Sequence, residues 1–195
     1  MKKKLILATN NKNKIKEISY ILSDLNIELI PQNNFNVLSV KEKGISFVEN
    51  AILKARYAAK ITRIPSLADD SGLVIPRIQN EPGLYSARYS KNNINNIDKL
   101  LCFFKKYNVN YLPAFYYCAV AMTFYENDPA PIISCGKVNG FIIKKKLGSN
   151  GFGYDKCFYL KDYNCTMAEL NNIKKNKISH RAKALYKLKL KKLYI

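Results

Sequence analysis

Short apolar segments alternate with segments of helical periodicity along this chain, and this alternation restricts its fold more than any other feature does. Residues 4–8 predict a strand and residues 9–14 a polar loop. Apolar residues at helical spacing then follow between Ile15 and Leu25. Strands and helices that interleave in this way place helices on the faces of a sheet. The sequence therefore predicts an α/β protein.

The rest of the chain continues the pattern, with a long β region in its middle. Further strands are predicted at 27–30, at 66–72, where the strand runs into an acidic turn, and at 115–125 and 132–144, which are expected to be antiparallel neighbours. Further helices are predicted at 51–60, behind the capping-box pair Ser46 and Glu49, and at 94–107, and a glycine-rich loop is predicted at 148–155. The last predicted element is a basic helix at 180–193 that Ser179 caps, and its apolar face carries Ala182, Leu185, Leu188 and Leu193. No linker separates two domains, so residues 1–195 are predicted to form a single two-lobed domain.

The composition excludes several classes of protein. Of the 195 residues, 48% are hydrophobic, enough for a sizeable core. The apolar part of the N-terminus is too short for a signal peptide, and the longest apolar run, 114–125, is too short to cross a bilayer. The five cysteines form neither a CxxC pair nor a zinc pattern. We expect a soluble, cytoplasmic protein with no membrane partner and with Cys118 as a buried apolar side chain.

The net charge of +19 would attract polyanions such as nucleic acids. However, the 33 Lys and Arg residues are spread along the chain, and no RNP, KH or zinc-finger pattern accompanies them. The chain is also rich in Lys, Asn, Ile and Tyr, which AT-biased codons over-supply, so a solvated surface is the simpler explanation. A basic nucleic-acid-binding module remains the alternative from a different class, and we expect no specific nucleic-acid partner.

Asp69 and Asp70 form the most informative local motif. A short apolar run leads into the pair and Ser71-Gly72 follows it, so both carboxylates are expected at the end of a strand, before a turn. Only 14 residues of the chain are acidic, which makes the pair conspicuous. Carboxylates so placed can bind Mg²⁺ and orient a water molecule. The alternative is an acidic turn in which one Asp caps the following backbone.

The polar loop at residues 9–14 is the second motif. It joins a predicted strand to a predicted helix, and backbone N–H groups at a helix start can hold phosphate. Lys14 lies in this loop. The glycine pattern of a Walker loop is absent, so the motif alone is weak.

Five segments, taken in order, resemble the inosine triphosphate pyrophosphatase family. They are residues 8–14, 46–51, 67–73 with 82–89, 151–155 and 178–181, and the likeness extends from Leu5 to about Leu188. The resemblance implies Mg²⁺-dependent hydrolysis of non-standard purine nucleoside triphosphates (dITP, ITP, XTP and dXTP) to the monophosphate and pyrophosphate. It also implies a two-lobed fold with a long central mixed sheet flanked by helices, a substrate cleft between the lobes, and a homodimer.

The resemblance carries catalytic and phosphate-binding residues over to matching positions. Asp70 matches the acidic residue that binds metal and activates water, Asp69 would support it or bind a second metal, and Glu42 is the expected further metal ligand. The expected phosphate-binding loop comprises Thr9, Asn10, Asn11, Lys12, Asn13 and Lys14, with Ser71 as a further donor to the substrate.

Recognition of the base needs an aromatic face and a hydrogen-bond donor. Phe152 is the candidate for stacking on a purine, with Tyr154 shaping the pocket; the alternative for either ring is packing in the core. Arg181, as well as His180, would donate to the 6-oxo group, and Asp155 would accept from the base edge or hold Arg181. The expected base-binding set is Phe152, Gly153, Tyr154, Asp155, Lys175, His180 and Arg181.

The chain departs from the family pattern at Asn10, Phe115, Lys156 and Ile173-Lys174, where Gly, Arg, Pro and an acidic pair are usual. Asn tolerates a left-handed φ better than most residues, so the turn at Asn10 is expected to survive. None of these departures removes a core catalytic group. The alternative within the same class is a nucleotide pyrophosphatase of similar architecture that acts on other modified nucleotides.

Overall fold

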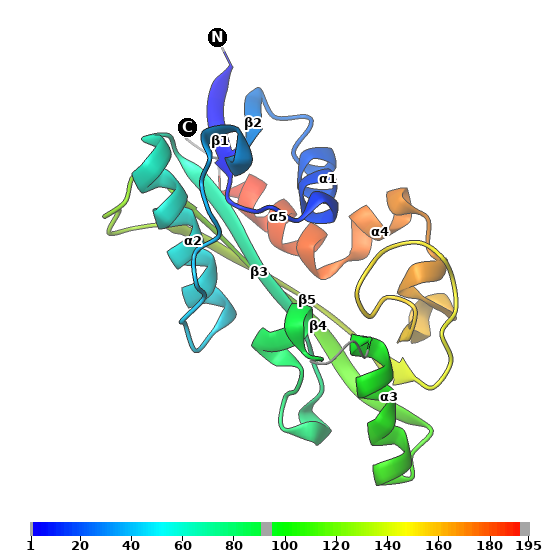
Figure 1. The fold of residues 1–195 in the computed structure, drawn as a ribbon. Helices are drawn as coiled ribbons and strands as arrows, with labels where there is room; N and C mark the ends of the chain where they lie inside the picture. Colours follow the sequence, from blue (N-terminus) through cyan, green and yellow to red (C-terminus); the bar gives the residue numbers. More distant parts are fainter. Residues whose placement is uncertain (1, 91–94, 192–195) are drawn as a thin grey trace. The chain divides into compact units, whose positions relative to one another are not determined.

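The computed structural model describes residues 2–90 and 95–191 (Figure 1). Its helices are α1 (Lys12–Ile21), α2 (Phe47–Thr62), α3 (Asn96–Tyr107), α4 (Asn172–Ile178) and α5 (His180–Leu190). Its strands are β1 (Lys3–Leu7), β2 (Ile27–Pro31), β3 (Ser66–Val74), β4 (Tyr111–Thr123), β5 (Ile132–Ile143), β6 (Phe158–Leu160) and β7 (Cys165–Thr166).

The strands form one mixed sheet, which confirms the predicted α/β class. Their order is β2-β1-β3-β4-β5-β6-β7. β1 is parallel to both β2 and β3, whereas β6 is antiparallel to β5 and β7. No helix within the described part of the chain is both long and apolar enough to cross a membrane.

The predicted elements are confirmed with shifted ends. The helix predicted from residue 94 begins at Asn96, and β4 begins at Tyr111, four residues before the predicted start. The last helix ends at Leu190; the part predicted beyond residue 191, including Leu193, lies outside the described residues, as does residue 94. α4 was not predicted from the sequence; it is a short helix that Asn171 caps by accepting the Lys174 N–H at 2.8 Å.

The N-terminus of α2 confirms Ser46 as a cap but corrects the capping box. The Ser46 hydroxyl accepts the N–H of Glu49 at 3.2 Å. The Glu49 carboxylate accepts the N–H of Ile45 at 2.7 Å, one residue earlier than in a capping box.

The described residues divide into two compact units, each with its own core. Unit 1 comprises residues 2–70, 118–136 and 180–191, and unit 2 comprises 71–90, 95–117 and 137–179. The buried apolar side chains fall into two clusters that follow this division.

Unit 1 is built around the parallel strands at its centre. Alternate residues of a strand face opposite sides, so Leu5, Leu7 and Leu67 share one face, where they pack in one cluster with α1 and α5. α1 and α5 contact each other, and α2 contacts β1 (Figure 1). Gly136 of β5 permits a close approach to α5, since a Cβ there would lie 2.1 Å from the His180 carbonyl oxygen.

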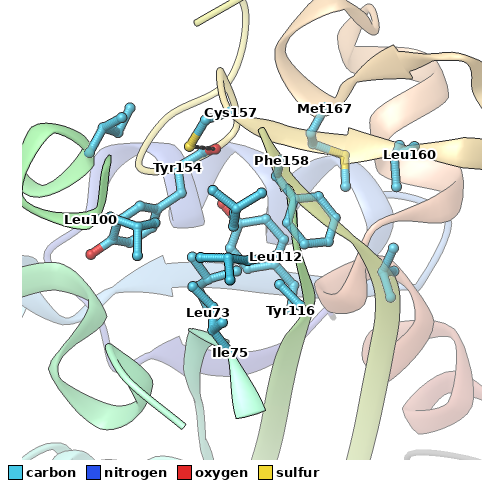
Figure 2. Packing of buried hydrophobic residues seen from close by; sticks show 14 of the residues in the cluster. Leu73, Ile75, Leu100, Leu112, Tyr116, Tyr154, Cys157, Phe158, Leu160 and Met167 are labelled. Carbon is cyan, nitrogen blue, oxygen red and sulfur yellow. Dashed lines mark hydrogen bonds between the residues drawn. The ribbon is translucent and has the colours of Figure 1, made fainter. Parts of the chain in front are cut away.

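Unit 2 has a core rich in aromatic side chains (Figure 2). The rings of Tyr116, on β4, and Phe158, on β6, lie 4.5 Å apart between centroids. Around them pack buried apolar side chains from β3 and the residue that follows it, from α3 and β4, and from the segment beyond β6, among them Leu73, Ile75, Leu100, Leu112 and Met167.

The predicted turn at Ser71-Gly72 is wrong, because β3 continues to Val74. β1 pairs with β3 at Ser66 and Leu67, and β4 is the neighbour of β3 on its other side. Farther along, the Ser86 hydroxyl accepts the N–H of Leu73 at 2.9 Å. The acidic pair therefore lies within a strand, and the alternation of side chains directs Asp69 and Asp70 to opposite faces of the sheet.

Candidate active site

Asp69 lies on the face of unit 1 that α1 and α5 cover. Its Oδ2 is 3.0 Å from the Lys14 Nζ and accepts from both Nε and Nη2 of Arg181 at 3.1 Å. Arg181 also donates through Nη1 to Glu17 of α1. The side chain of Asp69 is 0% exposed and that of Arg181 only 2%.

These contacts keep the buried groups ionised. Burial alone would raise the pKa of Asp69, but the cations of Lys14 and Arg181 outweigh it and hold that pKa well below its usual range. Burial would likewise lower the pKa of Arg181, whereas the carboxylates of Asp69 and Glu17 raise it. Asp69 therefore anchors Lys14 and Arg181, and of the two roles expected for Asp69 these contacts favour the supporting one.

Asp70 lies on the opposite face, toward α2. The Lys54 Nζ donates to Asp70 Oδ1 at 3.0 Å and to Glu42 Oε1 at 2.7 Å. Asn50 donates to Asp70 Oδ2 at 3.2 Å, and its Oδ1 accepts the N–H of Gly44 at 2.8 Å. Asn50 thereby ties the segment that carries Glu42 to the helix that faces Asp70.

The electrostatics of this cluster differ from those at Asp69. Burial, and to a lesser degree the charge of Glu42, raise the pKa of Asp70, while Lys54 opposes that rise. Burial would lower the pKa of Lys54, but the charges of Asp70, Asp69 and Glu42 raise it. Asp70 is therefore the carboxylate of the pair with the higher proton affinity.

The residues predicted to hold a metal fit a magnesium ion. Asp70 and Glu42 direct one carboxylate oxygen each at the same cationic centre, the Lys54 ammonium. Across residues 2–90 and 95–191, no three His, Cys, Asp or Glu side chains gather as a larger ligand set. Magnesium is commonly held by one or two carboxylates together with substrate phosphates, so two convergent carboxylates are an appropriate donor set.

The predicted phosphate loop is held by its own side chains. The Asn11 Oδ1 caps α1 by accepting the N–H groups of Asn13 and Lys14, at 3.0 and 3.2 Å, and Thr9 accepts the N–H of Asn11 at 3.2 Å. Asn10 accepts from Gln32 at 2.7 Å and donates to Ser39 at 3.1 Å. Asn10 is not among the positive-φ residues, so side-chain hydrogen bonds rather than a left-handed turn accommodate it. Lys12 is exposed in the first turn of the helix.

Unit 2 brings together Phe152, Asp155 and Lys175 of the residues predicted to read the base, whereas His180 and Arg181 belong to unit 1. Asp155 Oδ2 accepts the Lys175 Nζ at 2.8 Å and the N–H of Phe152 at 2.9 Å. The Lys175 ammonium lies 4.6 Å from the centroid of the Phe152 ring. A Cβ on Gly151 would lie 2.1 Å from Asp155 Oδ2, so glycine is needed where the loop closes on this carboxylate. Gly153 lies within the same closed turn.

The expectation that Asp155 holds Arg181 needs correction. Arg181 donates through Nε, Nη1 and Nη2 to Asp69 and Glu17, so these carboxylates, and not Asp155, hold it. Arg181 meets these carboxylates because it lies in the first turn of α5, on the face of the sheet toward which Asp69 points. Tyr154 follows the alternative of core packing: it is buried, and its hydroxyl donates to the Ser86 carbonyl at 3.0 Å. His180 is the first residue of α5 and is buried. Ser71 follows Asp70 in β3.

Sequence reasoning missed Lys54, Asn50 and Glu17. Their signal is helical spacing. Asn50 and Lys54 are four residues apart on α2, and Lys14 and Glu17 are three apart on α1, so each pair shares a helix face. The sequence could have indicated these residues, because polar residues at such spacing lie on the helices that flank the strand of the acidic pair.

The fold is a mixed sheet flanked by helices, and its site brings carboxylates and lysines together. The fold and site therefore define an α/β protein whose site suits a metal ion and phosphate groups. The family follows from comparison with known proteins. The profile of the Ham1 family matches residues 5–191, and the chain belongs to that family.

Relatives of similar length align over nearly the whole chain. A dITP/XTP pyrophosphatase of Legionella pneumophila (strain Lens) is 47% identical over 190 residues, covering 96% of this chain and 97% of the relative. One of Mannheimia succiniciproducens is 45% identical over 196 residues, or 98% of each chain. The solved structure of a HAM1 protein from Coxiella burnetii has a TM-score of 0.90 at 43% identity, covering 96% of this chain and 97% of that one.

Proposed function

We propose that this protein hydrolyses non-standard purine nucleoside triphosphates, dITP, ITP, XTP and dXTP, to the nucleoside monophosphate and pyrophosphate, and that it requires Mg²⁺. The observation that carries the proposal is the convergence of Asp70 and Glu42 on one cationic centre, which is close enough to Lys14 for the charge of Lys14 to act on Asp70. The names of the relatives, dITP/XTP pyrophosphatase, support the substrate class.

The reaction joins a water oxygen to the α-phosphorus. The bond from that phosphorus to the bridging oxygen breaks, and its electron pair leaves with pyrophosphate. Asp70 is suited to orient the water and accept its proton, because its pKa is raised by burial. Lys54 holds Asp70 and Glu42 in position, and Lys14 brings positive charge to the phosphate loop. Held by Asp70 and Glu42, Mg²⁺ would neutralise phosphate charge.

In unit 2, Lys175 takes the donor role that the sequence analysis gave to Arg181. An ammonium group has only donors, so a base atom that lies against it must be an acceptor. The 6-oxo group of hypoxanthine or xanthine is an acceptor, whereas the 6-amino group of adenine is a donor. Phe152 supplies an aromatic ring beside the ammonium.

The specificity of the reaction tests the proposed function. We expect kcat/KM for ITP and XTP to exceed that for ATP by about 10²-fold or more, because adenine would set a donor against the donor of Lys175. The measurement is pyrophosphate release from each nucleotide at saturating Mg²⁺. Equal kcat/KM for ITP and ATP would refute the base-reading argument, and no release from ITP or XTP would refute the function.

Removal of divalent metal should stop turnover. We expect excess EDTA to abolish pyrophosphate release from ITP and added Mg²⁺ to restore it. The two carboxylates are negatively charged, like the triphosphate, so a metal cation is needed to neutralise the phosphate charge. Circular dichroism should show an unchanged fold in EDTA, because Lys54 already bridges Glu42 and Asp70. Full activity in EDTA would contradict the metal requirement.

We further propose that the two units together make one enzyme domain, which works as a homodimer in the cytoplasm. All five cysteines are free thiols, and Cys118 is fully buried, as the sequence predicted. Burial raises the pKa of the Cys118 thiol, which makes it a poor nucleophile. Reduced cysteines are typical of cytoplasmic proteins.

A further inference from the structure

One hydroxyl group in the core of unit 2 points at the charged pair that lies beside Phe152. Tyr116 is 6% exposed, and its ring packs on Phe158 among apolar side chains (Figure 2). Its hydroxyl donates to Asp155 Oδ1 at 3.2 Å. Burial first, and then the charge of Asp155, raise the pKa of Tyr116 well above its usual value, so the hydroxyl keeps its proton at neutral pH.

The contacts of Asp155 connect this hydroxyl to the base-reading groups. Oδ1 accepts from Tyr116, and Oδ2 accepts from Lys175 Nζ and from the N–H of Phe152. Both carboxylate oxygens are therefore engaged, and the plane of the carboxylate is set from both sides. Lys175 reaches this position on a flexible four-carbon stem and is buried there.

We propose that Tyr116 is a positioning residue for recognition of the base: its hydroxyl orients Asp155, and Asp155 holds the Lys175 ammonium beside the Phe152 ring. This inference rests on the proposed function, because it assigns the Lys175 group to the base of the nucleotide. The last torsion of an aspartate is broad, so one oxygen without a donor lets the carboxylate turn. A turned carboxylate moves the ammonium that it holds, and a mispositioned donor weakens binding of the base.

Tyr116→Phe tests the proposal, because it removes the hydroxyl and keeps the ring that packs on Phe158. We expect the Kd of inosine monophosphate, measured by calorimetry, to rise about tenfold, near the lower end of the value of a hydrogen bond to a charged group. The Kd of inorganic pyrophosphate, which has no base, should stay within about twofold of the parent. With ITP as substrate, KM should rise by a similar factor at nearly unchanged kcat.

Tyr89→Phe is the matched control. Tyr89 is a buried tyrosine of the same unit, and its hydroxyl also donates to a carboxylate, Glu81, at 2.7 Å. General weakening of unit 2 would act in both variants, whereas only Tyr116→Phe should change inosine monophosphate affinity. A rise in both inosine monophosphate and pyrophosphate Kd, or the same change in Tyr89→Phe, would overturn the positioning role.

A double-mutant cycle tests the route through Lys175. In a Lys175→Met background, Tyr116→Phe should change inosine monophosphate affinity by less than about twofold, because the group that it positions is gone. A full tenfold effect in that background would refute the route. If the parent hydrolyses ITP and Tyr116→Phe binds inosine monophosphate like the parent, only this inference fails. If the parent neither binds inosine monophosphate nor hydrolyses ITP or XTP, the proposed function fails and the inference with it.

Discussion

Asp70→Asn is expected to lower the rate of ITP hydrolysis by about 10³-fold while leaving the fold intact. The amide has nearly the same shape as the carboxylate, but its single oxygen can accept from only one of Lys54 and Asn50. Lys54 keeps Glu42 as a charged partner, so the fold should survive the change. It cannot accept a proton from water at neutral pH, and it is a poor ligand for Mg²⁺. The loss should appear in kcat at saturating Mg²⁺, measured as pyrophosphate release.

Asp98→Asn provides the control for this substitution. Asp98 lies in the first turn of α3, where its half-exposed side chain pairs with Lys146. The same chemical change there should leave turnover within about twofold, because surface ion pairs contribute little. Parent-like turnover by Asp70→Asn, with a parent-like melting curve, would remove Asp70 from the proposed mechanism.

Asp69→Asn is expected to act mainly on stability, with a loss of about 3–5 kcal/mol in the free energy of unfolding. The substitution leaves the guanidinium of Arg181 and the ammonium of Lys14 facing a neutral amide, and Glu17 still pairs with Arg181. Removing one partner of a buried ion pair costs far more than losing a surface pair. Urea unfolding followed by circular dichroism measures the loss.

The two neighbouring substitutions form a sharp comparison. They make the same chemical change at adjacent residues of one strand, yet the first should act on kcat and the second on unfolding. Asp98→Asn should shift unfolding by less than about 0.5 kcal/mol. If Asp69→Asn unfolds like the parent, Asp69 does not anchor Lys14 and Arg181. If both variants lose stability and neither loses turnover, the opposite faces of Asp69 and Asp70 do not correspond to different functions.

Much of the fold could be predicted because it depends on local pattern. The strand at 27–30 was recognisable from its apolar run, the helix around 51–60 from its helix-forming residues, and Ser46 from its cap position. α4 was missed because seven residues provide too few apolar positions for a period to show. The turn at Ser71-Gly72 was wrong because pairing with a neighbouring strand outweighs the local turn preference of these two residues.

The sequence by itself determined the α/β class, the family segments, and the residue types available for metal, phosphate and base. Those properties reside in periodicity and in short motifs, which can be read along the chain. Only the tertiary structure decided how the residues are paired. Asp69 accepts hydrogen bonds from Arg181, which lies 112 positions away in the chain, and Asp155 accepts from Lys175 and Tyr116. Contacts between distant segments depend on the strand faces and helix positions that packing selects, and Asp69 and Asp70 differ because adjacent strand residues face opposite layers.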